Sequence, residues 1–172
     1  KHLYMSFKQH DGNWSEDHRT GLDGYIPWRL RVHDDLLYMS AALGSNAYNN
    51  AAADLRLFTS TDGIRFKPIS DEPQILHPLG IGEGEFIFES NGDIWGVARS
   101  EFDGSHTFHA KRDALHQWTT KHSEFKYDSS LLFEKDGQFF LIARRACLAE
   151  PFVRDDNVAG TAGALPPTIP VD

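Results

Sequence analysis

The sequence predicts an all-β fold, and three observations carry this prediction. Helical hydrophobic periodicity is scarce, whereas short apolar runs recur between residues 25 and 145. Turn dipeptides such as Asn91-Gly92 and Asp136-Gly137 separate these runs, and they tolerate the positive φ that two-residue hairpin turns require. The composition of 12 Phe, 5 Tyr and 4 Trp with 14 Gly and 8 Pro fits short strands and tight turns better than a helical bundle.

Three hairpins are expected in order along the chain. Each consists of two apolar runs that flank a polar turn: 28–32 with 36–42, 85–89 with 93–99, and 130–133 with 138–145. Two further strands are expected at 54–59 and 106–110, each followed by a turn of its own.

The second and third hairpins are copies of one another. Residues 91–99 (NGDIWGVAR) align with residues 136–144 (DGQFFLIAR), a spacing of 45 residues, and residues 36–40 also echo residues 2–6. Repeats of about 40 to 50 residues with several short strands each are typical of β-propeller blades. The repeat therefore predicts a β-propeller that opens partway through a blade.

The length of the chain limits how many blades it holds. At this spacing, 172 residues hold about three to four blades, so we expect an incomplete set. Residues 1–145 form these blades, and residues 146–172, which carry no strand pattern, form a loop or tail. A propeller closes on itself to protect its edge strands, so a partner copy or further segments are expected to complete the ring.

Charge and composition exclude several classes of function. Lys and Arg number 17 against 25 Asp and Glu, and the net charge of −8 is the wrong sign for a protein that mainly binds a phosphate backbone. The single Cys147 excludes an intrachain disulfide framework and a multi-cysteine zinc site. No run approaches the roughly 18 apolar residues of a membrane helix. We therefore expect neither a nucleic-acid partner nor a membrane span, and secreted, periplasmic and cytoplasmic locations all stay open.

Two turns after the additional strands have related sequences. Residues 60–66 read STDGIRF, and residues 111–118 are a degraded copy that keeps Asp113 and a terminal aromatic residue. In the first turn, Ser and Asp side chains can accept backbone N–H bonds, glycine supplies a positive φ and the aromatic ring packs under the hairpin. This pattern resembles the Asp-box (BNR) turn of sialidase-type β-propellers, which have six blades. Asp boxes are structural in that family, so Asp62 and Asp113 are expected to stabilise the fold.

A longer segment, residues 82–101 (GEGEFIFESNGDIWGVARSE), extends the resemblance. It is similar to the sialidase segment in which a Glu opens a strand, a hairpin turn follows and the next strand ends in Arg. Glu83 and Arg99 occupy these positions. In sialidases that Glu activates a tyrosine nucleophile, and that Arg is one of three that bind the substrate carboxylate, whose two oxygens match the rigid guanidinium fork.

The resemblance implies further site residues on neighbouring blades. Arg144 stands one repeat after Arg99, and Arg29, or alternatively Arg31, stands one blade before it. Asp54 matches the general acid of the family. Sialidases place the tyrosine nucleophile after the third arginine, whereas Tyr127 is the last tyrosine of this sequence and is the remaining candidate for the catalytic pocket.

Other short motifs occur together in a group of sialidase-like propellers to which no activity is attached. This sequence contains all of them across residues 25–145: Trp28-Arg29, Glu83-Gly84-Glu85-Phe86, Arg99-Ser100-Glu101, Tyr127-Asp128-Ser129 and Arg144-Arg145. They add Glu85, Glu101 and Asp128 to the candidate substrate-binding residues.

The resemblance predicts a sialidase-like glycoside hydrolase that acts on an anionic or hydroxyl-rich glycan, with Glu83 as base and without a cofactor. The alternative is a non-catalytic glycan-binding or scaffold propeller, which the lack of a late tyrosine favours. No metal site is expected, because His106 and His109 lie three residues apart on an expected strand and therefore face opposite sides.

Overall fold

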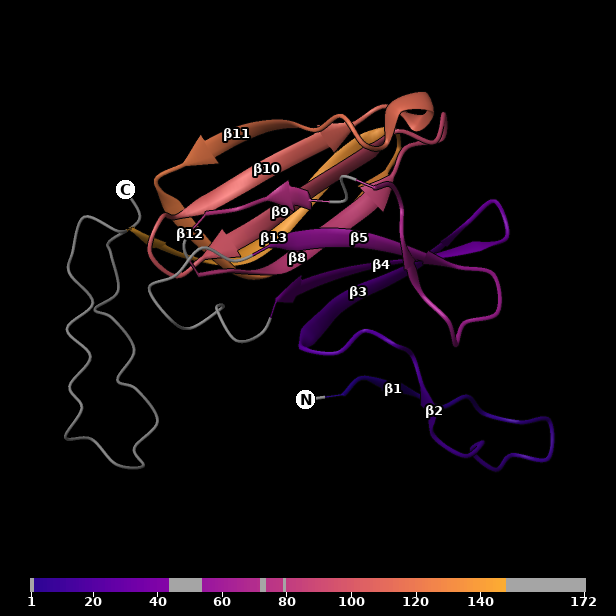
Figure 1. Ribbon diagram of the computed structural model, residues 1–172. Helices are drawn as coiled ribbons and strands as arrows, with labels where there is room; N and C mark the ends of the chain where they lie inside the picture. The colour runs from indigo at the N-terminus through magenta and orange to yellow at the C-terminus, as the bar shows by residue number, and fades with distance from the viewer. Residues whose placement is uncertain (1, 44–53, 72–73, 79, 148–172) are drawn as a thin grey trace, which may run out of the picture.

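The structure, a computed structural model, describes residues 2–43, 54–71, 74–78 and 80–147. In these ranges the protein is built from antiparallel strands (Figure 1) and contains no α-helix; the turn η1 (Arg112–Ala114) is a 3-10 helix. The expectation of an all-β fold is confirmed. Within the same ranges, no helix is long and apolar enough to cross a membrane.

The strands form four antiparallel sheets, and in the three larger ones neighbouring strands follow chain order. The first contains β3 (Tyr25–His33), β4 (Leu36–Leu43), β5 (Leu55–Ser60) and β6 (Lys67–Pro68), with β7 (Gln74–Leu76) also paired to β5. The second contains β8 (Ile81–Phe88), β9 (Ile94–Ser100), β10 (Ser105–Ala110) and β11 (Thr119–Ser123). The third contains β12 (Phe125–Lys135) and β13 (Gln138–Cys147), and a small hairpin contains β1 (Tyr4–Met5) and β2 (His18–Arg19). None of these sheets closes on itself within the described ranges.

The three expected hairpins form, and their turns use the chemistry that the sequence offers. Asp34 and Asp35 have φ of 47° and 61° between β3 and β4, and Asp136 and Gly137 have φ of 54° and 73° between β12 and β13. Two consecutive left-handed residues define the type I′ turn, which matches the twist of paired strands. The two further strands expected by sequence form as β5 and β10.

The turn after β5 has the hydrogen bonds expected from its side chains. The Asp62 Oδ1 accepts the backbone N–H groups of Ile64 and Arg65, each over 2.8 Å, and the Ser60 hydroxyl accepts that of Gly63 over 2.9 Å. Phe66 is buried beneath the turn. The two backbone bonds to Asp62, together with one that the Ser60 hydroxyl donates to Asp62 Oδ1 over 2.9 Å, lower the pKa of Asp62 to about 2. The corresponding stretch after β10 contains η1 instead, with Asp113 exposed.

The first strands of the three larger sheets lie together. Strand β8 contacts β3 and β4 on one side and β12 on the other, and β12 and β13 lie behind β8 and β9 in Figure 1. The Ser40 hydroxyl of β4 donates to the Gly84 carbonyl of β8. Gly84 also packs directly on Leu55, since an added Cβ would come within 2.6 Å of that side chain. The larger core cluster, which includes Phe86, Ile94 and Phe108, lies around this junction.

Each of these three first strands is interrupted by a shift in pairing register. The shifts fall between Pro27 and Arg29 in β3, between Gly82 and Glu85 in β8, and between Asp128 and Leu131 in β12. Such bulges bend a strand and change the direction of its side chains, and they are common beside active sites. Five of the candidate site residues lie at or next to these bulges: Arg29, Glu83, Glu85, Tyr127 and Asp128.

The repeated hairpins differ in how far they are buried. Ile94 and Val97 of β9 are 0% and 1% exposed, whereas the aligned Phe139 and Ile142 of β13 are 39% and 59% exposed. In the second sheet, β10 and β11 extend the sheet beyond β9. The same sequence pattern is therefore buried in one repeat and open in the next.

Candidate functional site

Arg99, near the end of β9, lies among three carboxylates. Its Nη1 is 3.4 Å from Glu83 Oε1 and 3.2 Å from Asp128 Oδ1, and its Nη2 is 2.7 Å from Glu101 Oε1. The Lys126 ammonium pairs with Glu101 and lies 3.8 Å from Asp128 Oδ1. We call these five residues the Arg99 cluster.

The cluster is acidic and largely withdrawn from water. It sets three carboxylates against two cations, and the Arg99 side chain is only 10% exposed. Burial alone would lower the pKa of Arg99, but the three carboxylates outweigh it and raise that pKa above its ordinary value. The buried Nε of Arg99 has no hydrogen-bond partner among the described residues. Ion pairs between its two Nη atoms and the carboxylates therefore hold this guanidinium in place.

Two bulges bring the cluster together. Glu83 in β8 and Ser129 in β12 have φ of 50° and 53°, and neither stands in a hairpin turn. The Ser129 backbone N–H donates to Glu83 Oε2 over 2.7 Å, and Arg144 Nη2 donates to the Ser129 hydroxyl over 3.3 Å. Left-handed residues other than glycine are uncommon and concentrate at functional sites. This strained contact therefore marks the Arg99 cluster as a candidate site.

Arg29 and Arg31 of β3 lie apart from the cluster and hold Glu85. Arg29 Nε donates to Glu85 Oε2, and Arg31 Nη2 donates to Glu85 Oε1 over 2.7 Å. The Glu85 side chain is fully buried, while the arginines are 28% and 34% exposed. Arg31 also donates to the Phe86 carbonyl over 3.1 Å. A substrate carboxylate at these arginines would have to compete with Glu85.

Asp54 has two basic partners of its own. Its Oδ2 lies 2.7 Å from Arg56 Nη2, and its Oδ1 lies 2.7 Å from His77 Nδ1. Burial raises the pKa of Asp54, but the hydrogen bonds and charges of these two partners outweigh it and lower that pKa below its ordinary value. A general acid needs the opposite shift.

Tyr127 faces away from the Arg99 cluster. Its neighbours Lys126 and Asp128 both belong to the cluster, and alternate residues of a strand point to opposite faces. Arg145, the cross-strand partner of Tyr127, stacks over the Phe125 ring at 3.4 Å on that other face. The tyrosine expected in the catalytic pocket is therefore on the wrong side of its strand.

The structure thus brings together part of the predicted site. Four of the predicted residues belong to the cluster and a fifth borders it: Glu83, Arg99, Glu101, Asp128 and Arg144. Four others are engaged elsewhere or face away: Arg29, Glu85, Asp54 and Tyr127. Sequence reasoning missed Lys126 and Ser129, although strand alternation from Asp128 would have placed Lys126 on the same face.

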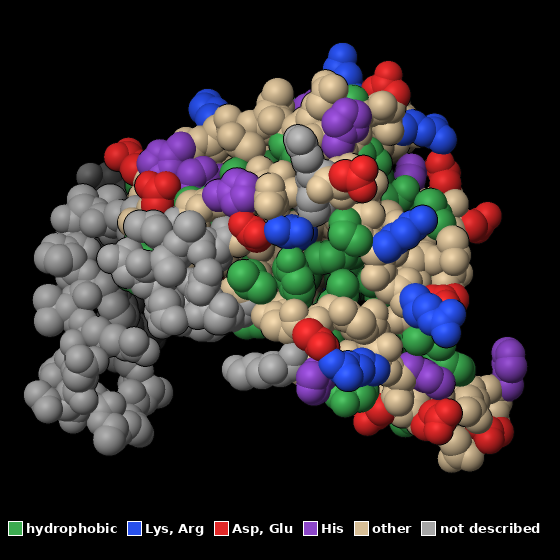
Figure 2. All heavy atoms as spheres, in the orientation of Figure 1, with side chains coloured by type: hydrophobic (Ala, Val, Ile, Leu, Met, Phe, Trp, Pro, Cys, Tyr) green, Lys and Arg blue, Asp and Glu red, His purple; other side chains and the backbone are tan. Residues whose placement is uncertain are grey.

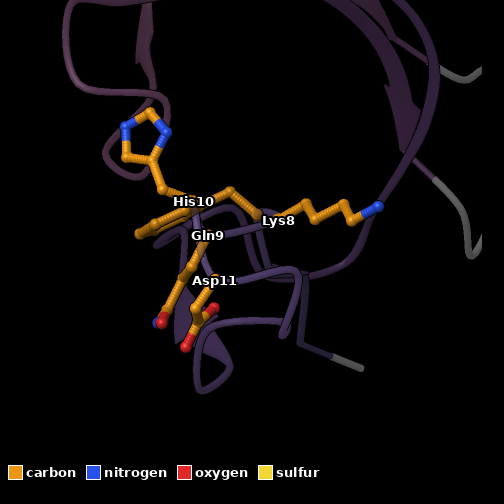
Figure 3. Close-up of a pocket in the computed structure, with 5 residues that line it drawn as sticks. Lys8, Gln9, His10 and Asp11 are labelled. Carbon is orange, nitrogen blue, oxygen red and sulfur yellow. The ribbon is translucent and has the colours of Figure 1, made fainter.

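Two surface hollows lie away from this cluster. Figure 3 shows the first, which is lined by residues 7–11 of the N-terminal hairpin loop, with the Lys8 and His10 side chains extending in different directions. The second is an apolar hollow that includes Met5, Leu30 and Met39. Neither hollow contains a predicted site residue, and acidic and basic side chains are interspersed over the face in Figure 2.

A comparison with the models of known protein families and with curated proteins finds no match to this chain. The sialidase resemblance therefore has no support from these comparisons.

Proposed function

We propose that this protein is a glycoside hydrolase of sialidase type and that the Arg99 cluster is its glycan-binding site. One observation carries the proposal. Bulges in the first strands of two neighbouring sheets gather three carboxylates around a single buried guanidinium.

The arrangement of the sheets supports a propeller scaffold for this site. The larger sheets follow chain order, and their first strands β3, β8 and β12 adjoin one another, as the inner strands of successive blades do. The Ser60–Phe66 turn, with two backbone N–H groups bonded to Asp62, supports its interpretation as an Asp box. The site would lie where the inner strands meet.

The carboxylates suit hydrolysis of a glycosidic bond. Glu83 Oε1 and Asp128 Oδ1 both contact Arg99 Nη1, so they lie within about 7 Å of each other. This separation is compatible with the roughly 5 to 9.5 Å of glycosidases that use two carboxyl groups, whereas sialidases use a tyrosine nucleophile in place of one of them. Glu83 would act as the base, held in place by the Ser129 N–H. Glu101 and Asp128 would accept hydrogen bonds from sugar hydroxyl groups.

Arg144 is the cation best placed to bind an anionic group of the glycan. It is exposed and its described contact is the neutral Ser129 hydroxyl, whereas Arg99 already has three carboxylate partners. A guanidinium group can donate two parallel hydrogen bonds to the two oxygens of a carboxylate. An acidic sugar would thus place its carboxylate at Arg144 and its hydroxyl groups over the cluster.

A non-catalytic glycan-binding propeller is the second candidate. Two positions favour it, because Tyr127 faces away from the cluster and Asp54 is held ionised by Arg56 and His77. In that case the cluster would bind the sugar without supplying either a nucleophile or an acid.

The test compares hydrolysis of a fluorogenic sialoside by the wild type, Glu83→Gln and Glu134→Gln. Glu134 is an exposed residue of β12 and serves as the matched control. Loss of turnover in Glu83→Gln alone would support the hydrolase, since positioned general bases contribute about 10²- to 10⁴-fold. Equal turnover in all three proteins would remove Glu83 from the reaction. If no protein turns over but free sialic acid binds to the wild type and not to Arg144→Ala, the binding function stands instead.

A further inference from the structure

A second group of side chains lies in the second sheet on β10 and the edge strand β11, beside the turn between β9 and β10. His106 of β10 and His122 of β11 are direct cross-strand partners, and Asp103 precedes β10 in the turn from β9. Figure 2 shows histidine and acidic side chains gathered over this end of β10 and β11. None of these three residues contacts the Arg99 cluster through any described ion pair.

The three side chains converge on a common point. His106 Nε2 is 3.1 Å from Asp103 Oδ2, and His122 Nε2 is 3.2 Å from Asp103 Oδ1. One ligand atom from each residue lies within 4.8 Å of the others. Four ligands at about 2.0 to 2.2 Å from a tetrahedral zinc ion are about 3.3 to 3.6 Å apart, so the two His–Asp103 separations are close to those of a metal site.

We propose that Asp103, His106 and His122 form a binding site for a divalent transition metal ion of the zinc type. Two imidazoles and one carboxylate are borderline donors that suit Zn²⁺, Co²⁺ and Ni²⁺ better than Mg²⁺ or Ca²⁺, which prefer oxygen ligands alone. Three protein ligands leave a fourth position of a tetrahedral ion open to water or to a ligand.

The turn that carries Asp103 is held in place by its neighbours. The Ser100 hydroxyl accepts the N–H of Asp103 over 2.9 Å, and the Ser100 N–H donates to the Gly104 carbonyl over 2.8 Å. Gly104 has φ of +67°, and an added Cβ would meet the Ser123 carbonyl at 2.1 Å. Only glycine allows this turn to approach β11 so closely, and the approach sets Asp103 beside His122.

The hydrogen bonds of the three residues would change when a metal binds. His122 Nε2 lies 3.0 Å from the backbone oxygen of Asp103 as well as near its carboxylate. Metal binding would exchange these contacts for a metal–nitrogen bond and release any proton on that nitrogen.

The test is a titration of the chelator-treated protein with ZnCl₂ by isothermal calorimetry. We compare the wild type with His122→Ala and with His116→Ala, which removes an exposed histidine outside the group. The wild type and His116→Ala are expected to bind one equivalent with the same affinity. Because loss of a second-shell partner already weakens metal binding about 10- to 100-fold, loss of the direct ligand His122 is expected to weaken it by at least about 100-fold.

The absorption spectrum of the Co²⁺-bound protein separates a built site from scattered histidines. Tetrahedral Co²⁺ gives visible absorption bands that an octahedral, water-bound ion lacks, and the wild type and His116→Ala are expected to show these bands. Asp103→Asn, which keeps the side-chain shape, is expected to lose them. Absence of one-equivalent binding in the wild type, or equal affinities in His122→Ala and His116→Ala with both folded by circular dichroism, would overturn the proposal.

Discussion

The backbone N–H of Ser129 donates to Glu83 Oε2 over 2.7 Å, and both residues have a left-handed backbone, with φ of 53° and 50°. The two residues belong to bulges in β12 and β8, strands of different sheets. Non-glycine residues in this conformation cost of order 1 to 3 kcal/mol. The contact between the sheets therefore holds the base candidate Glu83 in a strained position.

Substitutions at Ser129 test this strain. Ser129→Gly is expected to leave the free energy of unfolding within about 1 kcal/mol of wild type, because glycine adopts positive φ without a steric penalty. Ser129→Val is expected to lower it by about 2 kcal/mol, since a β-branched residue is disfavoured there. Urea denaturation measures both, and Glu134→Val, at an exposed strand position, serves as control with a change of about 0.5 kcal/mol or less. Equal free energies of unfolding for Ser129→Val and Ser129→Gly would contradict a strained, left-handed backbone at Ser129.

The buried carboxylate of Glu85 supports a second prediction. Glu85→Gln removes the only negative charge that Arg29 and Arg31 contact in the described residues. Breaking a fully buried ion pair costs about 3 to 5 kcal/mol, but both arginines are partly solvated, so we expect about 2 to 3 kcal/mol. Denaturation in guanidinium chloride measures this change in the free energy of unfolding. The control is Glu89→Gln, which changes a partner of the exposed Trp95 indole and is expected to cost less than about 1 kcal/mol.

Local sequence chemistry predicted the all-β class and the three long hairpins, while the propeller arrangement of the sheets stays a prediction. The hairpins at residues 28–42, 85–99 and 130–145 formed around the expected polar turns, and the Asp-Asp and Asp-Gly pairs make the two-residue turn. The Asn91-Gly92 pair does not: only Gly92 has a positive φ, and the Glu89 N–H donates to the Asp93 carbonyl across residues 90–92. The turn at Asp62 formed with the hydrogen bonds that its side chains predict. Strands β1, β2, β6, β7 and β11 were missed because they are short or, like Thr119–Ser123, lack an apolar alternation.

The candidate site was predictable only where it depends on a single hairpin. Glu83, Arg99 and Glu101 belong to β8 and β9 or follow them directly, so their proximity follows from the hairpin register. The partner of Arg29 is Glu85, 56 residues away, and that contact depends on how two sheets pack. The sequence spacing of two residues does not indicate which of them meet when two sheets pack.

The histidine pair shows the same limit. From the sequence, His106 was compared only with His109, which lies on the same strand. In the structure His106 pairs with Asp103, and His109 lies near Asp93. The approach of His106 to His122 comes from the register between β10 and β11, which is set by Gly104 and the turn at η1. A strand without an apolar pattern gave no means of predicting that register.

Gly96 supports a packing prediction. An added Cβ there would meet Phe108 Cζ at 2.0 Å and the Glu85 carbonyl at 2.7 Å. Gly96→Ala is therefore expected to lower the free energy of unfolding by about 1 to 3 kcal/mol through overpacking. Phe108→Leu in the same chain is expected to restore part of this loss, with a coupling energy of about 0.5 kcal/mol or more in a double-mutant cycle. Strictly additive effects would show that the Phe108 ring is not the obstacle.

The Asp62 turn gives a pH-dependent prediction. The backbone N–H groups of Arg65 and Ile64, and then the side-chain hydroxyl of Ser60, donate hydrogen bonds that lower the pKa of Asp62 to about 2 from the ordinary 3.8. Between these values the unfolded chain binds more protons than the folded one, so this stabilisation is complete above pH 3.8 and is lost as the pH falls through about 2. The Tm of Asp62→Asn is therefore expected to lie below that of wild type at pH 5 and to approach it at pH 2.

Thermal unfolding of the wild type and Asp62→Asn between pH 2 and pH 5 measures this convergence. Asp113→Asn is the control, because the Asp113 carboxylate accepts no backbone hydrogen bond within the described residues and lies in η1. Its Tm difference from wild type is expected to follow no such trend. A Tm difference for Asp62→Asn that stays constant from pH 5 to pH 2 would mean that ionisation of the Asp62 carboxylate does not contribute to the stability of the turn.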